Sequence, residues 1–203
     1  YHKACQFMSV LILPATAVIA FFSYEILLLW TGNPVTAENT YMLASILIIG
    51  TALNGLMNMP YALQLAHGWT RLTFYVNLLS VVLLVPLTMF MAWKFGAIGA
   101  SFVWVILNSG YVIIAIQFMH RRLLKREKWI WYGKDVGIPM IVALATAGVF
   151  KWIAGGAYSS PWMSVAILIL ISSVTLGATA LMTPTTRNFV FNQLMKFKLT
   201  YGS

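Results

Sequence analysis

The chain has 203 residues, of which 61% are hydrophobic and only 8% are charged, and its mean hydropathy is +0.84. A soluble domain carries roughly 25% charged residues to keep its surface hydrated, so a water-soluble fold is the poorer interpretation. The net charge of +9 would suggest nucleic-acid binding in a soluble protein, but here the cations lie between long apolar runs, and no nucleic-acid partner is expected.

Six apolar runs follow one another, each near the roughly 20 residues that cross a bilayer as a helix. In chain order they are Gln6 to Phe22, Tyr41 to Leu65, Leu72 to Trp93, Gly96 to Met119, Val136 to Ile153 and Pro161 to Met182. Barrel strands are about ten residues long and alternate apolar with polar residues, which these runs do not. The sequence therefore predicts an all-α polytopic membrane protein, a bundle of about six transmembrane helices.

The basic residues indicate how these helices are oriented. If the spans alternate in direction, only Lys94 and Lys151 face one side, and the other eleven of the 13 lysines and arginines face the opposite side. Cytoplasmic loops carry the excess of basic residues, so both termini are expected in the cytoplasm. Lys151 is the one charge within a run, close enough to its end to reach the headgroups.

Seven of the eight tryptophans fall at or just beyond predicted span ends, where the amphipathic ring prefers the headgroup zone. They are Trp30, Trp69, Trp93, Trp129, Trp131, Trp152 and Trp162. This distribution agrees with the boundaries that hydropathy predicts.

Two longer basic segments stand outside the spans. Residues 120–135 mix apolar and cationic side chains, a composition suited to a basic interfacial loop lying along an anionic leaflet, and a specific regulatory site is the less favoured alternative. Residues 183–203 are expected to form a basic cytoplasmic tail. The chain also opens without an initiator Met, so we expect it to be part of a longer protein.

Polar side chains inside the runs are candidates for a transport path, because a lone polar group facing lipid is costly. Thr51, Asn54 and Asn58 lie near one face of the second span, and Asn108 lies near the middle of the fourth. An equally good alternative is that these asparagines hydrogen-bond neighbouring helices and do no more. Asn77 is a weaker candidate, as is Gln117.

Enzyme signatures are missing from the sequence. The three histidines have no metal-binding spacing, no P-loop or G-x-S-x-G motif occurs, and the four acidic residues all lie outside the predicted spans. We therefore predict a protein that is not an enzyme, with no catalytic residues, no metal site and no cofactor.

Three stretches occur in a familiar order. Tyr24 to Gly32 (YEILLLWTG), Asn58 to Leu72 (NMPYALQLAHGWTRL) and Phe95 to Trp104 (FGAIGASFVW) resemble the Wzx-type polysaccharide flippases of the multidrug, oligosaccharidyl-lipid and polysaccharide exporter superfamily. The resemblance covers roughly residues 1–135. The second and third stretches also have physical interpretations of their own: Pro60 bends or ends a helix, Gly68 permits a tight turn, and Gly96 permits another.

The resemblance implies that residues 1–203 are the C-terminal six-span portion of a transporter of twelve to fourteen spans, whose N-terminal lobe is missing here. Such a protein flips lipid-linked oligosaccharide, the O-antigen repeat unit of lipopolysaccharide on an undecaprenyl-pyrophosphate type carrier, across the bacterial cytoplasmic (inner) membrane by alternating access. Asn54, Asn58 and Asn108 would then border the substrate cleft, and Arg71 would meet the pyrophosphate through charge-assisted hydrogen bonds. Membrane lipids are the other expected partner.

Three alternatives stay open. A multidrug or cation exporter of the same superfamily would need acidic residues within its lobes. An integral membrane glycan transferase or ligase would need a sizeable outer loop with catalytic residues, and the loops here are short. A purely structural membrane subunit is the third.

Overall fold

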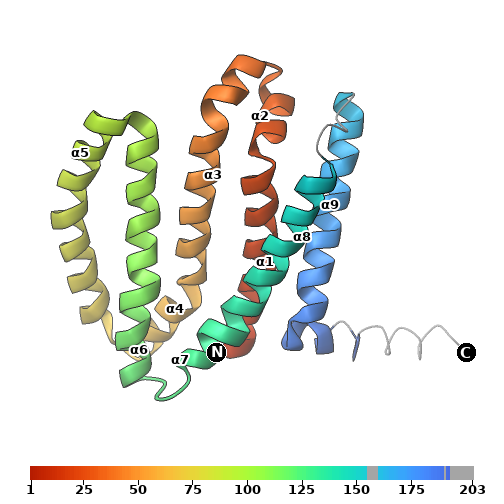
Figure 1. The fold of residues 1–203 in the computed structure, drawn as a ribbon. Coiled ribbons are helices and arrows are strands. Elements are labelled where there is room, and N and C mark those ends of the chain that lie inside the picture. Colours follow the sequence, from red (N-terminus) through yellow and green to blue (C-terminus); the bar gives the residue numbers. More distant parts are fainter. Residues whose placement is uncertain (155–159, 190, 193–203) are drawn as a thin grey trace, which may run out of the picture.

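The computed structural model describes residues 1–154, 160–189 and 191–192, and every element assigned in them is helical (Figure 1). The elements are α1 (His2–Phe21), α2 (Ser23–Thr31), α3 (Pro34–Leu56), α4 (Asn58–Ala66), α5 (Thr70–Gly110), the π-helical η1 (Tyr111–Ala115), α6 (Ile116–Arg122), α7 (Lys128–Ile130), the π-helical η2 (Trp131–Gly137), α8 (Ile138–Ile153) and α9 (Pro161–Met182). The all-helical fold class is confirmed for these residues.

Local sequence sets where the helices begin and end. Asn33 caps α3, because its Oδ1 accepts hydrogen bonds from the Val35 and Thr36 amides at 2.9 and 3.2 Å, and Pro34 follows at the first helical position. Gly32, with φ of 63°, ends α2 in the left-handed conformation that glycine adopts without strain.

The second predicted span is bent. The chain is helical from Pro34 to Ala66 except at Met57, where α3 ends and α4 begins. Pro60 lies four residues after Leu56, and a proline has no N–H to bond that carbonyl. The break at Met57 is therefore the bend that Pro60 predicts.

Five helices in the described ranges are long and apolar enough to cross a membrane: His2–Phe21, Pro34–Ala66, Thr73–Arg122, Lys128–Ile153 and Pro161–Met182. About six were predicted, and the difference lies in Thr73–Arg122, which contains two predicted spans. At Gly96 φ is 64° and ψ is −152°, and the chain reverses there into two antiparallel limbs (Figure 1). We call Thr70–Phe95 the first limb and Ala97–Gly110 the second limb.

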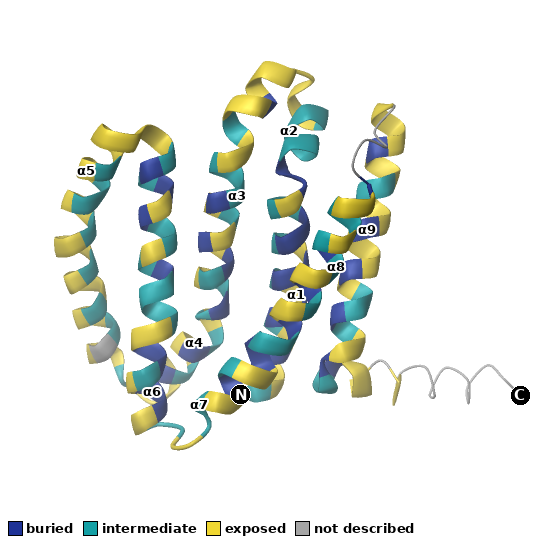
Figure 2. Ribbon diagram, viewed as in Figure 1, coloured by how far each residue is buried: buried dark blue, intermediate teal, exposed yellow. Residues whose placement is uncertain are grey.

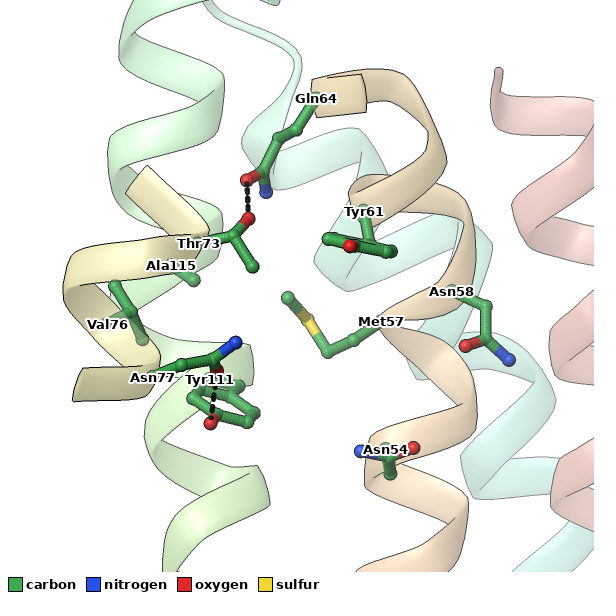
Figure 3. Close-up of a pocket in the computed structure, with 10 residues that line it drawn as sticks. All are labelled: Asn54, Met57, Asn58, Tyr61, Gln64, Thr73, Val76, Asn77, Tyr111 and Ala115. Atoms are coloured by element: carbon green, nitrogen blue, oxygen red, sulfur yellow. Dashed lines mark hydrogen bonds between the residues drawn. The ribbon is translucent and has the colours of Figure 1, made fainter. Parts of the chain in front are cut away.

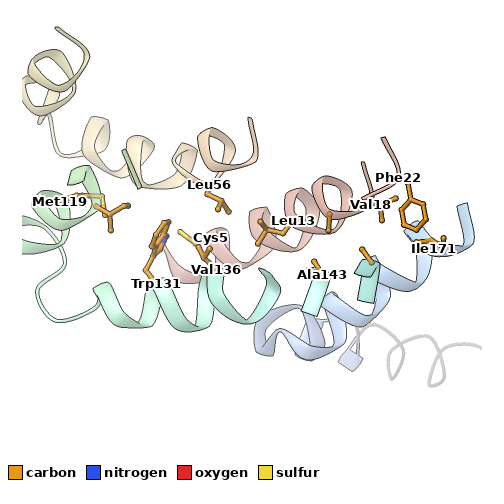
Figure 4. Close-up of a cluster of buried hydrophobic side chains, with 13 residues drawn as sticks. Cys5, Leu13, Val18, Phe22, Leu56, Met119, Trp131, Val136, Ala143 and Ile171 are labelled. Atoms are coloured by element: carbon orange, nitrogen blue, oxygen red, sulfur yellow. The ribbon is translucent and has the colours of Figure 1, made fainter. Parts of the chain in front are cut away.

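The limbs, α3, α1 and the α8–α9 pair follow one another across the bundle (Figure 1). α1 is central, since it packs against α3, α8 and α9. Buried side chains that fill the space around it include Leu13, Val18, Phe22, Val136 and Ile171 (Figure 4). α3 also approaches the second limb closely, because a Cβ at Gly50 would lie 2.4 Å from the Trp104 ring.

Exposed residues lie along much of the outer surface of the bundle (Figure 2), and many of them carry large apolar side chains. On the first limb Phe74, Val82 and Met89 are at least 60% exposed. Such a continuous apolar surface is unfavourable in water and suits contact with lipid tails. Together with the long apolar helices, it indicates a multi-pass membrane protein.

α1 begins and α9 ends at the same end of the bundle, where α6 and α7 also lie (Figure 1). An even number of crossings requires this arrangement. Which side of the membrane this end faces stays a prediction.

Two details of the prediction are wrong at residues 120–135. Helix Lys128–Ile153 begins eight residues before the predicted span, so Asp135 lies inside a candidate span, not outside it. Trp131 is fully buried and is not at a lipid interface. Both side chains lie one helical turn apart and face α1, where Gln6 donates a hydrogen bond to Asp135. Only residues 123–127 of the predicted loop lie outside helices.

The predicted basic tail at 183–203 lies mostly outside the described residues. Within its described part, Thr183 and Thr186 are buried, and the Thr185 amide donates a hydrogen bond to Gln6 Oε1 at 3.1 Å. This contact joins the residues after α9 to α1.

Candidate functional site

A pocket of about 260 Å³ lies between α3 and α4 on one side and the first limb with η1 on the other (Figure 3). It is lined by Asn54, Met57, Asn58, Tyr61, Gln64, Thr73, Val76, Asn77, Tyr111 and Ala115. Seven of these ten side chains carry an amide or a hydroxyl, and none carries a charge. An uncharged polar wall among apolar helices can offer hydrogen bonds to a neutral polar ligand but no ion pair.

The bend at Met57 shapes the wall that α3 and α4 form. The Met57 side chain projects into the pocket, Tyr61 lies beside it one turn later, and Asn58 lies at the pocket's edge (Figure 3). Asn54 lines the pocket one turn before Asn58, on the α3 side of the bend. Asn54, Asn58 and Tyr61 therefore contribute to one wall, and the spacing of the two asparagines predicts that they share it.

One hydrogen bond lies within the opposite wall and a second joins the two walls. Tyr111 donates its hydroxyl proton to Asn77 Oδ1 at 2.8 Å, which joins η1 to the first limb. Thr73 donates to Gln64 Oε1 at 3.1 Å, which joins the first limb to α4 (Figure 3). Tyr111 opens a π-helical stretch, an irregularity that occurs frequently at functional sites.

Asn108 lies outside the pocket and supports it from behind. Its side chain is fully buried, its Oδ1 accepts from Asn54 Nδ2 at 2.9 Å, and its Nδ2 donates to the Trp104 carbonyl at 2.8 Å. Asn108 therefore makes the hydrogen bond expected if these asparagines only join neighbouring helices. Asn54 makes the same bond and also lines the pocket.

Arg71 is exposed in the first turn of α5 and does not line the pocket. The turn before it contains Gly68, whose φ of 64° is the left-handed conformation expected of that glycine. Thr73, two residues after Arg71, does line the pocket, so Arg71 lies near one end of it. The structure therefore brings together Asn54 and Asn58 at the pocket, places Asn108 behind them and leaves Arg71 outside.

Of the two weaker candidates, Asn77 lines the pocket, whereas Gln117 accepts a hydrogen bond from Lys128 Nζ at 3.0 Å elsewhere. Sequence reasoning missed Gln64, Thr73 and Tyr111. The tight turn at Gly68 is a signal that could have paired the first two, because it places the end of α4 beside the start of α5. Nothing in the sequence signals that Tyr111 faces Asn77.

A second polar cluster lies where α1 begins. His2 contacts Asp135 through Nδ1 and Glu127 through Nε2, the latter at 3.0 Å, and Gln6 Nε2 donates to Asp135 Oδ1 at 2.9 Å. Burial raises the pKa of the neighbouring Tyr1 phenol, so its hydroxyl stays protonated. In the part of the chain that the structure describes, no three His, Cys, Asp or Glu side chains are placed to hold a metal ion.

The fold and the pocket thus define a helical membrane protein with an uncharged polar site between its helices. A curated protein of Shigella flexneri named "Putative O-antigen transporter" is 26% identical to this chain over 125 residues. The match covers 60% of this chain and 29% of that protein, so the chain spans less than a third of the length of this relative. No model of a protein family matches the chain, and no solved structure matches it.

Proposed function

We propose that this chain is the C-terminal, six-crossing portion of a transporter that flips lipid-linked oligosaccharide across the bacterial inner membrane. The observation that carries the proposal is the uncharged polar pocket between the bent α3–α4 helix and the first limb. The partial similarity to a protein named as an O-antigen transporter supports the same role. The sixth crossing comes from counting the two limbs of α5 separately.

The pocket suits the sugar part of such a substrate. Asparagine side chains offer both a donor and an acceptor, so they can bind neighbouring hydroxyls of a sugar ring, and Tyr61 offers an aromatic face. Asn54, Asn58 and Asn77 are the residues we assign to this contact, with Asn108 holding Asn54 in place. Arg71, exposed near one end of the pocket, would meet the pyrophosphate.

The pocket's size fits one part of the substrate. Small-molecule sites usually measure about 300 to 1,000 Å³, and this pocket is slightly smaller than that range. It would therefore hold one end of an oligosaccharide in this conformation. The missing lobe would supply the facing wall, and movement between the lobes would expose the site to each side in turn.

The pocket's chemistry favours this function over a cation exporter. None of the four acidic residues lines it, and a cationic drug or Na⁺ would require a carboxylate there. A transferase or ligase would require a nucleophile or a general base at the site. The lining residues are asparagine, glutamine, tyrosine, threonine and apolar side chains, which offer neither in an activated form.

The test is complementation of a bacterial strain that lacks its own flippase by the full-length protein that contains this chain. Asn58→Ala changes an exposed pocket side chain, so the fold should be retained. Asn77→Ala also removes the hydrogen bond from Tyr111, so its protein level and far-UV circular dichroism are compared with those of the parent. Each variant is expected to lower surface polysaccharide about fivefold or more at an equal protein level, the cost of one lost hydrogen bond. Asn39→Ala, near the start of α3 and outside this pocket, is the matched control.

Unchanged surface polysaccharide in the Asn58 and Asn77 variants would refute the assignment of this pocket. Changed drug resistance in the same strains, with polysaccharide unaffected, would favour the multidrug exporter instead.

A further inference from the structure

We propose that the basic groove lined by His120, Arg121, Lys125, Arg126, Lys128 and Trp129 binds the phosphate headgroup of an anionic membrane lipid. The groove measures about 440 Å³ and shares no residue with the polar pocket. The proposal therefore stands whether or not the proposed transport function is right.

The groove is formed by the end of α6, the connection 123–127 and the start of α7. Arg126 adopts a left-handed backbone conformation, with φ of 75°, which is uncommon for a residue other than glycine. Lys128 is held on one side of the groove, because its Nζ donates to Gln117 Oε1 at 3.0 Å and lies 4.9 Å from the centre of the Trp129 ring. The cations thus line a shaped surface.

Within the described part of the chain, no acidic side chain forms an ion pair with the lysines and arginines of this groove. The chain has four acidic residues in all. Glu127 and Asp135 both contact His2, and Glu25 pairs with Lys151 at 2.6 Å. Glu38 lies on α3 near its start, at the far end of the bundle from α6 and α7 (Figure 1).

Arg121, Lys125 and Arg126 consequently form no ion pair within the described ranges 1–154, 160–189 and 191–192. Neighbouring like charges without counter-charges repel one another, and a bound anion would relieve that repulsion. No described carboxylate of the chain pairs with these three cations, which leaves them available to an anion from another molecule.

His120 forms the buried side of the groove, and its ring lies beside Tyr1 and Trp131. Its side chain lines the groove yet is only 2% exposed. Its Nδ1 hydrogen-bonds the Ile116 carbonyl at 3.1 Å, while its Nε2 is buried and has no hydrogen-bond partner among the residues described. Because Nδ1 donates to the Ile116 carbonyl, Nε2 of the neutral ring can only accept a hydrogen bond, and a lipid phosphodiester has no proton to donate. The contacts to the phosphate are therefore assigned to Arg121, Lys125 and Arg126.

The position of the groove identifies a lipid as the source of the phosphate. It lies at the end of the bundle where candidate spans Thr73–Arg122 and Lys128–Ile153 meet, which is the depth of the lipid headgroups. Trp129 is 71% exposed at its rim and Ile130 beside it is 40% exposed. An aromatic ring next to cations suits the boundary between headgroups and acyl chains, and basic pockets between spans bind such lipids.

The test counts lipids bound to the full purified chain by native mass spectrometry while phosphatidylglycerol is titrated into the detergent. The variant R121Q/K125Q/R126Q removes three cations from the groove. The matched control K3Q/K134Q/R187Q removes three exposed cations from the same end of the bundle but outside the groove. A charge-only attraction to anionic lipid would weaken equally in both variants.

We expect the groove variant to bind phosphatidylglycerol at least about tenfold more weakly, and the control to stay within about twofold of the parent chain. Phosphatidylcholine should bind weakly to all three proteins. Equal losses in the two variants would overturn the proposal. Displacement of the bound lipid by excess inorganic pyrophosphate would also overturn it, because the groove would then be a site for a free phosphate compound.

Discussion

The hydrogen bond between Asn54 and Asn108 offers a direct test of how the pocket is held. We consider the variants Asn108→Ala, Asn54→Ala and the two combined. In the structure Asn54 Nδ2 donates to Asn108 Oδ1 at 2.9 Å, Asn108 is fully buried, and Asn54 is exposed at the pocket. The bond joins α3 to the second limb, so losing it should loosen one wall of the pocket.

The magnitude follows from burial and from the membrane setting. Interhelical side-chain hydrogen bonds in membranes are worth about 0.6 kcal/mol on average and about 1.7 kcal/mol at most. Asn108→Ala also leaves a small buried void, which costs about 1 kcal/mol. We therefore expect Asn108→Ala to lower the free energy of unfolding by about 2 kcal/mol, and Asn54→Ala by about 1 kcal/mol.

The double variant distinguishes a real bond from mere proximity. Because both single variants lose the same bond, the double variant should lose about 1 kcal/mol less than their sum. Unfolding in mixed dodecyl maltoside and SDS micelles, followed by far-UV circular dichroism, measures these values. Asn39→Ala, an exposed asparagine near the start of α3, should change the free energy of unfolding by less than about 0.5 kcal/mol.

Strict additivity of the Asn54 and Asn108 effects would refute this reasoning. It would mean that the two side chains do not stabilise one another, and that α3 and the second limb are held by apolar packing alone.

Two further variants test the fold in the same assay. Gly96→Ala should lower the free energy of unfolding by about 1 to 3 kcal/mol, because φ of 64° and ψ of −152° strain any residue with a Cβ. The control Gly110→Ala should be neutral or stabilising, because Gly110 has a helical φ of −58° and open space around it. Equal effects of the two variants would contradict the hairpin at Gly96. Asp135→Ala should cost about 2 kcal/mol, because buried Gln6 loses its hydrogen-bond acceptor and His2 keeps only the contact with Glu127, and a cost near that of exposed Glu38→Ala would show that the cluster is not formed.

Much of the backbone followed from local sequence. Several features are each interpretable from neighbouring residues alone: the apolar runs long enough to cross a bilayer, Asn33 and Pro34 at the start of α3, Pro60 near the bend and Gly96 at the hairpin. These features depend on helix period, hydrogen-bond donors and backbone sterics, all of which act within a few residues. The segregation of basic residues was likewise visible in the sequence, although the side of the membrane stays a prediction.

Residues 120–135 show where such reasoning fails. Their composition indicates an interfacial loop, yet Trp131 and Asp135 are fully buried against α1. An acidic side chain in a candidate span becomes tolerable only because His2 and Gln6, more than 120 positions away in the chain, supply its partners. The composition of residues 120–135 shows that Asp135 is charged, but not that His2 and Gln6 are its partners.

The candidate site likewise has some features that the sequence predicts and others that only the tertiary structure shows. The sequence by itself determined that Asn54 and Asn58 share a wall, because helix period places them one turn apart. Only the tertiary structure decided that Asn108 stands behind that wall, that Arg71 lies outside it, and that Thr73, Asn77 and Tyr111 complete the pocket. The reason is physical: which face of one helix meets which face of another depends on packing across the whole bundle, and no local pattern encodes it.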